Sequence, residues 1–503
     1  GYGNEKGWRQ ATRTENYNGF TNLGRQGIRG GFRFQVFAAR SRAKTAGSLP
    51  QSIFDVSPEA NFTPGDFENL NQQQGSFAGY RDFGASRFSL TLYGRRTNAE
   101  RFNVNQAPDP DVRAFSRNRT VGGTLDWRWT HPTATGSFSI RLGTDAARHW
   151  VRVDIHNESP GADTLSTSVK SPSWDLAGYG LGDLRAGRVT LSAGVRYDYV
   201  RIPFNDLLDP TADTSSSYQR VSPRAGLSVD LGHGFSAYGS WGQSFRAPAL
   251  LELTCADETA PCPLPFALGD DPPLKPVLAR TAELGGRAIV GNTSLSGSLY
   301  RTDVDDDIYF ISGSLVQGFF SNIGKTRREG VELGAQSFLA GGHSLYLNYA
   351  YSRATFRTVT TIASQIENLG GPGAGPNNTT EVGDRLPLVP EHQIRGGISL
   401  ALPKRVVAGA DLRYTGSQFL RGDEGNNTTT LHGFFTADFR LGWAIGPWVI
   451  SGLVSNLFNT TTPVFGTFNQ NRNTGDVERF LTPAQHRAFK VVLKREFGGG
   501  GRE

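Results

Sequence analysis

Four carboxylates lie within five residues of one another, at Asp303, Asp305, Asp306 and Asp307. Carboxylate oxygens are the ligands that Ca²⁺ prefers, and the ion takes about six to eight of them. Their spacing does not match that of a calcium-binding loop. We therefore interpret the group as the solvated, charged end of a strand, with a weak calcium site as the alternative.

Cys255 and Cys262 are the only cysteines of the chain, and they lie in a segment rich in proline. Their even number favours a disulfide in an oxidising compartment, with two free thiols as the alternative. A bond closing so short a loop would add about 2 kcal/mol of stability through chain entropy. A metal site is not favoured, because no His lies nearby.

Aromatic side chains follow the four carboxylates in the sequence. Tyr309, Phe310, Phe319 and Phe320 are predicted to lie on a loop beyond the end of a strand. The favoured interpretation is a hairpin that extends beyond the ends of its neighbouring strands. Ligand contact is the alternative, since binding residues are often carried by loops.

Arginines on the polar faces of three predicted strands form a further candidate binding surface. Arg196, Arg413 and Arg440 would suit an anionic metal chelate, because guanidinium groups bind carboxylates with paired hydrogen bonds. The favoured interpretation is structural pairing with aspartates two residues away on the same face, namely Asp198, Asp411 and Asp438.

The sequence contains no recognisable catalytic motif. Its eight His residues are scattered, and neither a His-Glu-x-x-His nor a Gly-x-Ser-x-Gly motif nor a phosphate-binding loop occurs. The net charge of +6 comes from 52 basic and 46 acidic residues that are interleaved, unlike the basic patch of a nucleic-acid binder. We predict that the protein is not an enzyme, needs no cofactor and binds no nucleic acid.

The elements that must position these residues are strands, because apolar and polar residues alternate over segments of about ten residues. In the segment 431–444, Asp438 and Arg440 share one face, and the opposite face carries Phe435, Phe439, Leu441 and Trp443. No run of about 18 apolar residues occurs, which excludes a transmembrane helix. The pattern is typical of an all-β, antiparallel transmembrane β-barrel with a polar lumen.

Short and long connections alternate along the chain. Tight turns are predicted at 231–234, 291–293, 341–343, 403–405 and 445–447. Outer-membrane barrels place their short turns in the periplasm and their long loops outside the cell. We count about 19 strands, from 18–28 to 485–497. A soluble all-β adhesin or propeller is a less favoured alternative, because it would not segregate its loops so strictly.

Six short motifs are spaced along the chain. They are 194–198 (GVRYD), 223–227 (PRAGL), 244–248 (SFRAP), 322–332 (NIGKTRREGVE), 383–387 (GDRLP) and 456–458 (NLF). In this order they resemble the barrel domain of the TonB-dependent receptors. Arg246 lies within the third motif, where it would either reach the lumen mouth or form a local structural bond. Phe497 is similar to the family's terminal aromatic, which the barrel assembly machinery reads.

The resemblance implies an active transporter of the Gram-negative outer membrane. Its ligand would be a ferric siderophore or a similar metal chelate, with vitamin B12, heme or carbohydrate as alternatives and a passive porin as the main competing class. The implied partners are the TonB–ExbB–ExbD complex, acting through a plug domain and TonB box, and the barrel assembly machinery. Outer-membrane lipid and lipopolysaccharide would surround the protein, which is expected to be a monomer.

Family barrels have about 22 strands, so the count also implies that three strands and the plug are missing. We predict an N-terminally truncated barrel domain at 1–497 and a flexible tail at 498–503. The chain has no Met and begins without a signal peptide, which agrees with a cut chain. Because the first and last strands would both descend, we expect a gap or a strained parallel seam between them, and no transport by this fragment alone.

Overall fold

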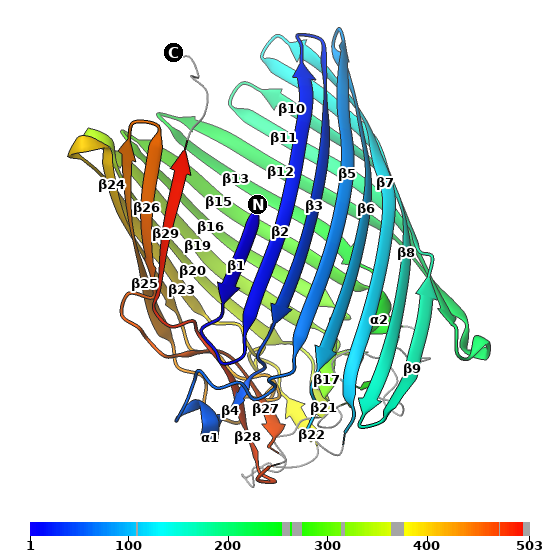
Figure 1. Ribbon diagram of the computed structural model, residues 1–503. Coiled ribbons are helices and arrows are strands. Elements are labelled where there is room, and N and C mark those ends of the chain that lie inside the picture. Colours follow the sequence, from blue (N-terminus) through cyan, green and yellow to red (C-terminus); the bar gives the residue numbers. More distant parts are fainter. Residues whose placement is uncertain are drawn as a thin grey trace.

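The wall of the molecule is one sheet of 21 strands that curves around a lumen (Figure 1). This computed structural model describes residues 1–106, 109–253, 262–263, 274–312, 317–363, 377–471 and 473–495. Neighbouring strands pair antiparallel and mostly in chain order, as successive hairpins do. The predicted all-β, antiparallel barrel architecture is confirmed.

The strands of the wall vary in length from five residues in the first to 24 in the longest. A membrane-spanning strand needs only about 9–11 residues, so the longest strands extend beyond the bilayer. The strands are β1 (Tyr2–Lys6), β2 (Arg13–Gln26), β3 (Gly30–Lys44), β5 (Phe67–Phe83), β6 (Ser86–Asn103), β7 (Asp111–Thr133), β8 (Gly136–Ser159), β9 (Ala162–Ser171), β10 (Trp174–Ala186), β11 (Val189–Asp206), β12 (Thr214–Gly232), β13 (Phe235–Arg246), β15 (Val277–Val290), β16 (Thr293–Asp305), β19 (Thr326–Leu339), β20 (His343–Phe356), β23 (His392–Leu402), β24 (Val406–Thr415), β25 (Phe434–Ile445), β26 (Trp448–Ser455) and β29 (Ala488–Arg495).

Shorter elements lie in the long loops, at the lower end of the barrel in Figure 1. They are β4 (Leu49–Pro50), α1 (Gln51–Phe54), η1 (Pro210–Ala212), α2 (Leu250–Leu253), β14 (Cys262–Pro263), β17 (Ile308–Ser312), β18 (Gln317–Asn322), β21 (Thr360–Ala363), β22 (Asn377–Thr380), β27 (Pro463–Gln470) and β28 (Val477–Pro483). Two short 3-10 segments, η2 (Ala340–Gly342) and η4 (Pro403–Arg405), form tight turns at the other end. None of the helices in the described part of the chain is long and apolar enough to cross a membrane.

The predicted tight turns all connect neighbouring strands, and they share one rim of the barrel. The turn between β15 and β16 has Gly291 at φ 57°, and the turn between β25 and β26 has Gly446 at φ 56°. Such left-handed angles favour glycine, because a Cβ atom would be strained there. Short turns mark the periplasmic rim of an outer-membrane barrel, so the long loops mark the extracellular end.

The strand count differs from the predicted value in two places. β1 was missed because its sequence, YGNEK, has no apolar alternation, yet it pairs with β2 along its whole length. The second difference lies at 149–163, where β8 continues to Ser159, the chain turns at Gly161 with φ 82°, and β9 begins. β9 pairs with β8 and with the end of β11, so it continues the wall beyond the extracellular end of β10.

The sheet is open between β1 and β29. Among the described residues, no ladder joins β29 to β1 or to β2. The expected gap is therefore present, but the parity argument behind it was wrong. With β1 included, the two edge strands point in opposite directions (Figure 1).

The lipid-facing register predicted for β25 is confirmed by exposure and pairing. Phe439 is 38% exposed, Leu441 45% and Trp443 46%, and Phe435 on the same face is also exposed. Asp438 and Arg440 lie on the other face and form ion pairs with charged side chains of β24. Apolar atoms therefore face lipid, and charges face the lumen.

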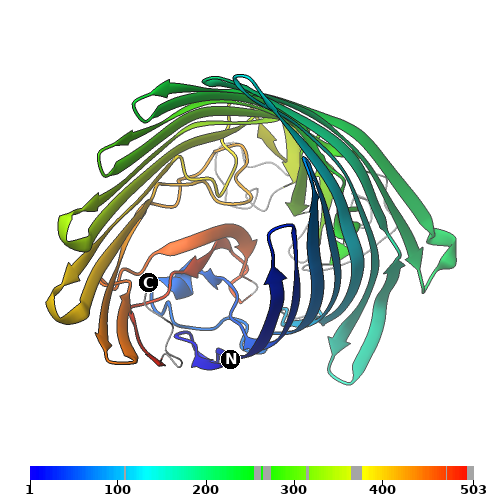
Figure 2. The same cartoon turned by 90° about the horizontal axis from the view of Figure 1, so that it is seen from above.

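The buried apolar core lies mainly in the extracellular loops instead of in the wall. One cluster joins β4, α1, β27 and β28 to the loop 416–431, through Leu49, Phe54, Leu420, Leu431, Phe468 and Leu481. A second cluster joins β17 and β18 to the ends of neighbouring wall strands. Figure 2 shows α1, β27 and β28 inside the outline of the wall. We call this set of folded loops, β4, α1, β17, β18, β21, β22, β27, β28 and 416–431, the cap.

Candidate functional site

The loop 416–431 connects the two apolar clusters of the cap. Leu420 packs in the first cluster, and Arg421 forms a parallel bridge with Thr467 of β27. The backbone N–H of Arg421 donates to the carbonyl oxygen of Gly466 at 3.1 Å. The guanidinium group of the same residue reaches β17, where Nη2 donates to the carbonyl oxygen of Phe310 at 3.3 Å. One arginine therefore joins three segments that are far apart in the sequence.

Aromatic rings surround this guanidinium group. The Arg421 Cζ atom lies 5.0 Å from the ring centre of Phe310 and 5.9 Å from that of Tyr309. The Phe310 ring also meets the ring of Phe320 edge-on, at 5.0 Å between centres. Arg421, Tyr309 and Phe310 are only partly buried. Their remaining surface offers a positive charge between aromatic faces, an arrangement that suits an anionic, aromatic ligand.

A buried carboxyl group lies beneath these rings. Glu424 is 2% exposed, and its Oε1 atom accepts hydrogen bonds from the Tyr309 hydroxyl at 2.9 Å and from the Gly422 N–H at 3.0 Å. Its Oε2 atom is buried and has no hydrogen-bond partner among the described residues. Burial raises the pKa of Glu424, because water no longer solvates the charged form. Burial and the nearby carboxylate together raise the pKa of Tyr309.

The neighbouring carboxyl group has a different, structural environment. Asp423 is fully buried and accepts hydrogen bonds from the Asn427 N–H at 2.7 Å, the Thr428 N–H at 3.0 Å and the Thr428 hydroxyl at 2.6 Å. Burial again raises the pKa of this carboxyl group. Because its acceptors are occupied by its own loop, Asp423 shapes the turn 423–428 and presents no open ligand atom.

Glu424→Gln is expected to stabilise the cap at neutral pH and to reduce the fall of its stability with rising pH. The folded pKa of Glu424 is raised above its ordinary value of 4.5, so its contribution to stability is full below about that pH and falls as pH rises. An uncharged amide avoids the added cost of burying a charge, which exceeds that of an unsatisfied neutral polar group, about 1–3 kcal/mol. Hydrogen-exchange protection of the cap amides, corrected for intrinsic exchange, measures the effect as pH rises from about 4. Equal pH slopes in the two proteins would contradict it.

The predicted loop aromatics lie inside the cap and are not freely exposed. Phe319 is 6% exposed and belongs to the second apolar cluster, against which Tyr309 packs. Phe310 and Phe320 form the ring pair beside Arg421. The hairpin interpretation describes β17 and β18 correctly, and ligand contact by these residues stays a prediction. Sequence reasoning missed Arg421 and Glu424, because the polar segment 421–425 carries no periodic signal.

A comparison with known families decides the relationship of this chain. A family model described as the TonB dependent receptor-like β-barrel matches residues 4–457. The chain belongs to this family. The members of this family are outer-membrane transporters and receptors and not enzymes, in agreement with the prediction from the sequence.

Relatives of this receptor barrel include the catecholate siderophore receptor Fiu. Fiu of Escherichia coli O6:H1 is 23% identical over 254 residues, which cover 50% of this chain and 30% of Fiu. Fiu of Escherichia coli K12 shows the same identity and coverage. The chain thus matches less than a third of the length of these curated relatives.

Solved structures show the same fold at low sequence identity. The ferric citrate transporter FecA matches with a TM-score of 0.76 and 15% identity, over 98% of this chain and 71% of FecA. The ferric yersiniabactin receptor FyuA of Yersinia pestis matches with a TM-score of 0.76 and 16% identity, over 99% of this chain and 74% of FyuA. At such identities these matches show the fold alone.

The lumen arginines of this receptor barrel are paired, but mostly not as predicted. Arg440 contacts Asp411 at 2.8 Å and Arg413 contacts Asp438 at 3.8 Å, so both pairs cross between β24 and β25. The register places Asp411 opposite Asp438, which brings each arginine diagonally next to the other strand's carboxylate. Arg196 does contact Asp198 on its own strand at 2.8 Å, and it also contacts Asp145 at 2.6 Å.

The four clustered aspartates each have a basic partner. Asp303 contacts Arg301 and Arg327, Asp305 contacts Arg280 and Lys325, Asp306 contacts Lys275, and Asp307 contacts Arg328. In the described part of the chain no three acidic, His or Cys side chains are grouped closely enough to hold a metal ion. The charged strand end is thus an ion-pair network, which favours the solvated interpretation over the calcium site.

Of the remaining predicted residues, Arg246 forms a local bond, whereas the roles predicted for Cys255, Cys262 and Phe497 are not tested by the structure. Arg246 donates to Glu252 at 2.6 Å, and the same carboxylate accepts the Ala249 N–H, so this arginine closes the turn after β13. Cys255 and Phe497 lie outside the described residues, as does the side chain of Cys262. The disulfide and the assembly role of Phe497 therefore stay predictions.

Proposed function

We propose that this receptor takes up a ferric siderophore or a similar metal chelate across the outer membrane, with energy supplied through TonB. The observation that supports this most is the cap, a folded set of loops with a cation among aromatic rings, at the extracellular mouth of a polar-lumen barrel. Relatives and structural neighbours named for catecholate siderophore, ferric citrate and ferric yersiniabactin agree with that ligand class.

The chemistry of the cap fits a chelate that carries negative charge on aromatic rings. Arg421 supplies charge and hydrogen-bond donors, while Phe310 and Tyr309 supply faces on which a flat ring can pack. Burial raises the pKa of Glu424 below them, which favours the uncharged form and so weakens repulsion of an anion. The lumen arginines Arg413 and Arg440 lie below as a second candidate surface, although their pairing with aspartates favours a structural role.

In the proposed cycle the ligand binds the cap from outside the cell. The TonB–ExbB–ExbD complex then acts on a plug domain to open a path through the lumen. A passive porin is less favoured, because an open channel needs no loops folded together inside its mouth (Figure 2). The barrel assembly machinery is the expected partner for insertion, and the monomer is the expected state.

Uptake of radiolabelled ligands by cells tests the proposal, with iron as the label for the ferric chelates and for heme, and cobalt as the label for vitamin B12. Cells with the intact receptor gene and with a deletion of that gene are compared under iron limitation, with ferric catecholate, ferric citrate, vitamin B12 and heme as separate substrates. We expect uptake of one ferric chelate that is lost on deletion of the receptor gene and equally on deletion of tonB. Uptake that persists without TonB would identify a passive channel, and uptake of only vitamin B12 or heme would overturn the ligand class.

A further inference from the structure

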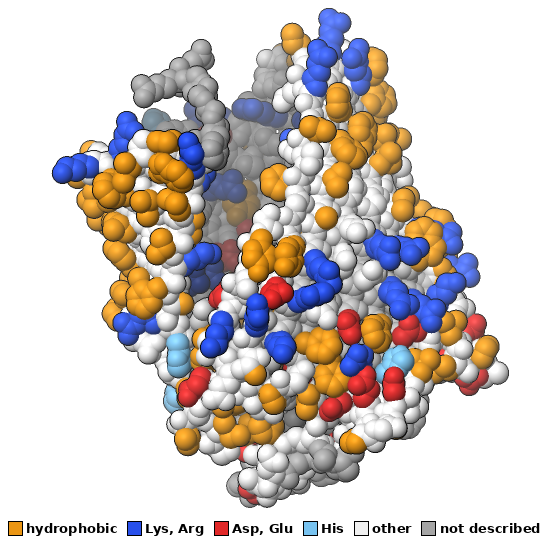
Figure 3. Space-filling model, viewed as in Figure 1, with side chains coloured by type: hydrophobic (Ala, Val, Ile, Leu, Met, Phe, Trp, Pro, Cys, Tyr) orange, Lys and Arg blue, Asp and Glu red, His pale blue; other side chains and the backbone are white. Residues whose placement is uncertain are grey.

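Basic side chains form a band on the outer surface of the wall, between the apolar belt and the extracellular loops. Figure 3 shows Lys and Arg side chains gathered there, below the apolar side chains that cover β2 to β7. The cross-strand register places these cations on the same face as the exposed residues Phe34, Leu92 and Val121, which face lipid. The band comprises Lys6, Arg13, Arg40, Arg42, Lys44, Arg96, Arg113, Arg117, Arg119, Arg148, Arg152 and Lys170.

Like charges in this band lie directly opposite one another across neighbouring strands. Arg96 of β6 faces Arg119 of β7, Arg117 of β7 faces Arg152 of β8, and Arg152 faces Lys170 of β9. Such pairs destabilise a sheet unless an anion lies between them. Asp154 is the carboxylate within reach, at 3.0 Å from Arg152 and 3.6 Å from Arg117. Elsewhere in the band Glu15 contacts Arg13, and Glu100 and Glu158 contact Arg113. Four carboxylates against twelve cations still leave an excess of positive charge.

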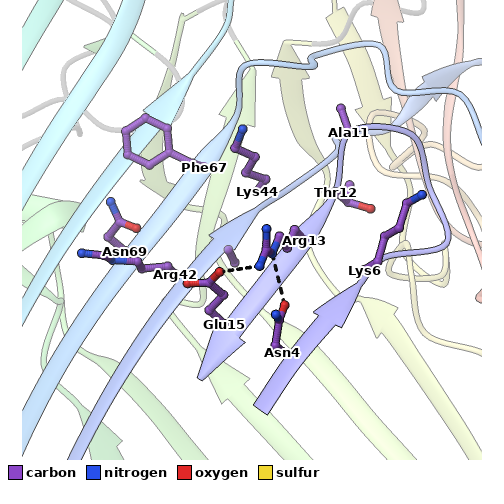
Figure 4. A pocket seen from close by; sticks show the side chains of 11 residues that line it. Asn4, Lys6, Ala11, Thr12, Arg13, Glu15, Arg42, Lys44, Phe67 and Asn69 are labelled. Carbon is purple, nitrogen blue, oxygen red and sulfur yellow. Dashed lines mark hydrogen bonds and ion pairs between the residues drawn. The ribbon is translucent and has the colours of Figure 1, made fainter. Parts of the chain in front are cut away.

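The cations line grooves that also have apolar walls. A groove of about 1040 Å³ is lined by Arg96, Arg119 and Lys170 together with Val36, Val121 and Trp150. A second groove, of about 900 Å³, lies at β1 to β5, where Phe67 lies on the side of Arg42 and Lys44, and Lys6 of β1 lines the opposite side (Figure 4). The ligand that fits has phosphate groups to contact the cations and acyl chains to continue along the apolar belt.

The band is restricted to one side of the barrel. An excess of positive charge is therefore not a feature of every strand near the extracellular rim. On the other side, three outward-facing cations, Arg280, Arg301 and Arg327, each contact an aspartate, at 2.7, 3.1 and 2.6 Å. By contrast, Arg40, Arg42, Arg96, Arg119 and Lys170 make no ion pair with any carboxylate in the described ranges. From Arg42 on β3 to Arg152 on β8 the band crosses four strand spacings, roughly 19 Å at about 4.8 Å each.

We propose that this basic band binds a phosphorylated glycolipid of the outer leaflet, the lipid A part of lipopolysaccharide. Its phosphates lie between Arg96, Arg119 and the neighbouring cations of β7 to β9, and its acyl chains pack on the apolar belt. Bidentate contacts between arginine and phosphate hold the headgroup at a fixed height on the wall. Each basic residue that contacts an anionic lipid surface typically raises the affinity for that surface by about a factor of five.

Binding of purified lipid A to the full chain in detergent tests the proposal. The variant Arg96→Gln, Arg119→Gln, Arg152→Gln is compared with the wild type, and Arg280→Gln, Arg301→Gln, Arg327→Gln is the matched control on the opposite side. We expect the first variant to bind bisphosphorylated lipid A about 100-fold more weakly and the control to bind as the wild type does. Retained heat-modifiable migration shows that each variant folds, and the single substitutions Arg96→Gln and Arg119→Gln replace the triple variant if it does not.

Two further ligands test whether the phosphates alone, the acyl chains alone or both together account for binding. Lipid A without phosphates is expected to bind at least about tenfold more weakly than the bisphosphorylated form, and inorganic phosphate alone is expected to compete only at far higher concentration. Equal binding of dephosphorylated lipid A would overturn the proposal, because the acyl chains alone would then account for association. Equal losses in both triple variants would also overturn it, since the effect would then reflect net charge.

Discussion

Phe439→Arg is expected to lower the free energy of unfolding of the barrel in lipid by about 2–4 kcal/mol, the cost of a basic side chain at the bilayer midplane. Phe439 lies on the lipid-facing side of β25, between Ala410 of β24 and Val454 of β26. The guanidinium group would lie in hydrocarbon with no carboxylate on the same face of either neighbouring strand. Denaturant unfolding in lipid vesicles measures the loss.

A matched pair of substitutions on β6 separates the effect of the face from the effect of the charge. Leu92 is 49% exposed on the lipid side, and the adjacent Thr91 lies on the lumen side at the same depth. Leu92→Arg is expected to show a loss of the same size as Phe439→Arg, whereas Thr91→Arg is expected to be nearly neutral because water and polar groups surround it. Equal losses at positions 91 and 92 would show that the assigned register is wrong.

Arg421→Ala is expected to weaken binding of the transported ferric chelate by at least about tenfold. The substitution removes a charged hydrogen-bond donor, worth about 1.5–3 kcal/mol, and the contacts with the rings of Phe310 and Tyr309. About 1.4 kcal/mol corresponds to a factor of ten in affinity. Because Arg421 also joins β17 to β27, the cap amides are expected to exchange faster. Ligand binding to purified receptor, with hydrogen exchange, measures both effects.

Two further variants control for charge and for location. Arg421→Lys keeps the positive charge but loses the planar fork, so an intermediate affinity is expected. Arg188→Ala removes an exposed arginine at the turn between β10 and β11, at the opposite end of the barrel, and no change is expected. Unchanged ligand affinity in Arg421→Ala would remove this residue from the proposed binding surface.

The sequence by itself determined the wall of the barrel. Side chains of a strand alternate between its two faces, so Phe439 and Arg440 were assigned to lipid and lumen without any knowledge of neighbouring strands. Tight turns such as the one at Gly291 are also local, because a glycine in a left-handed conformation is sufficient to reverse the chain. β1 was missed for the same reason, since it lacks alternation and is fixed only by pairing with β2.

Only the tertiary structure decided which residues meet. The diagonal contact of Arg440 with Asp411 depends on the register between β24 and β25, which no single strand encodes. The basic band depends on the same kind of register, because Arg96, Arg119 and Arg152 come from three separate strands. The cap depends on long-range packing, in which Leu49, Leu420 and Phe468 share one cluster. Periodicity therefore specifies the face of each side chain, whereas strand register and loop packing specify its partners.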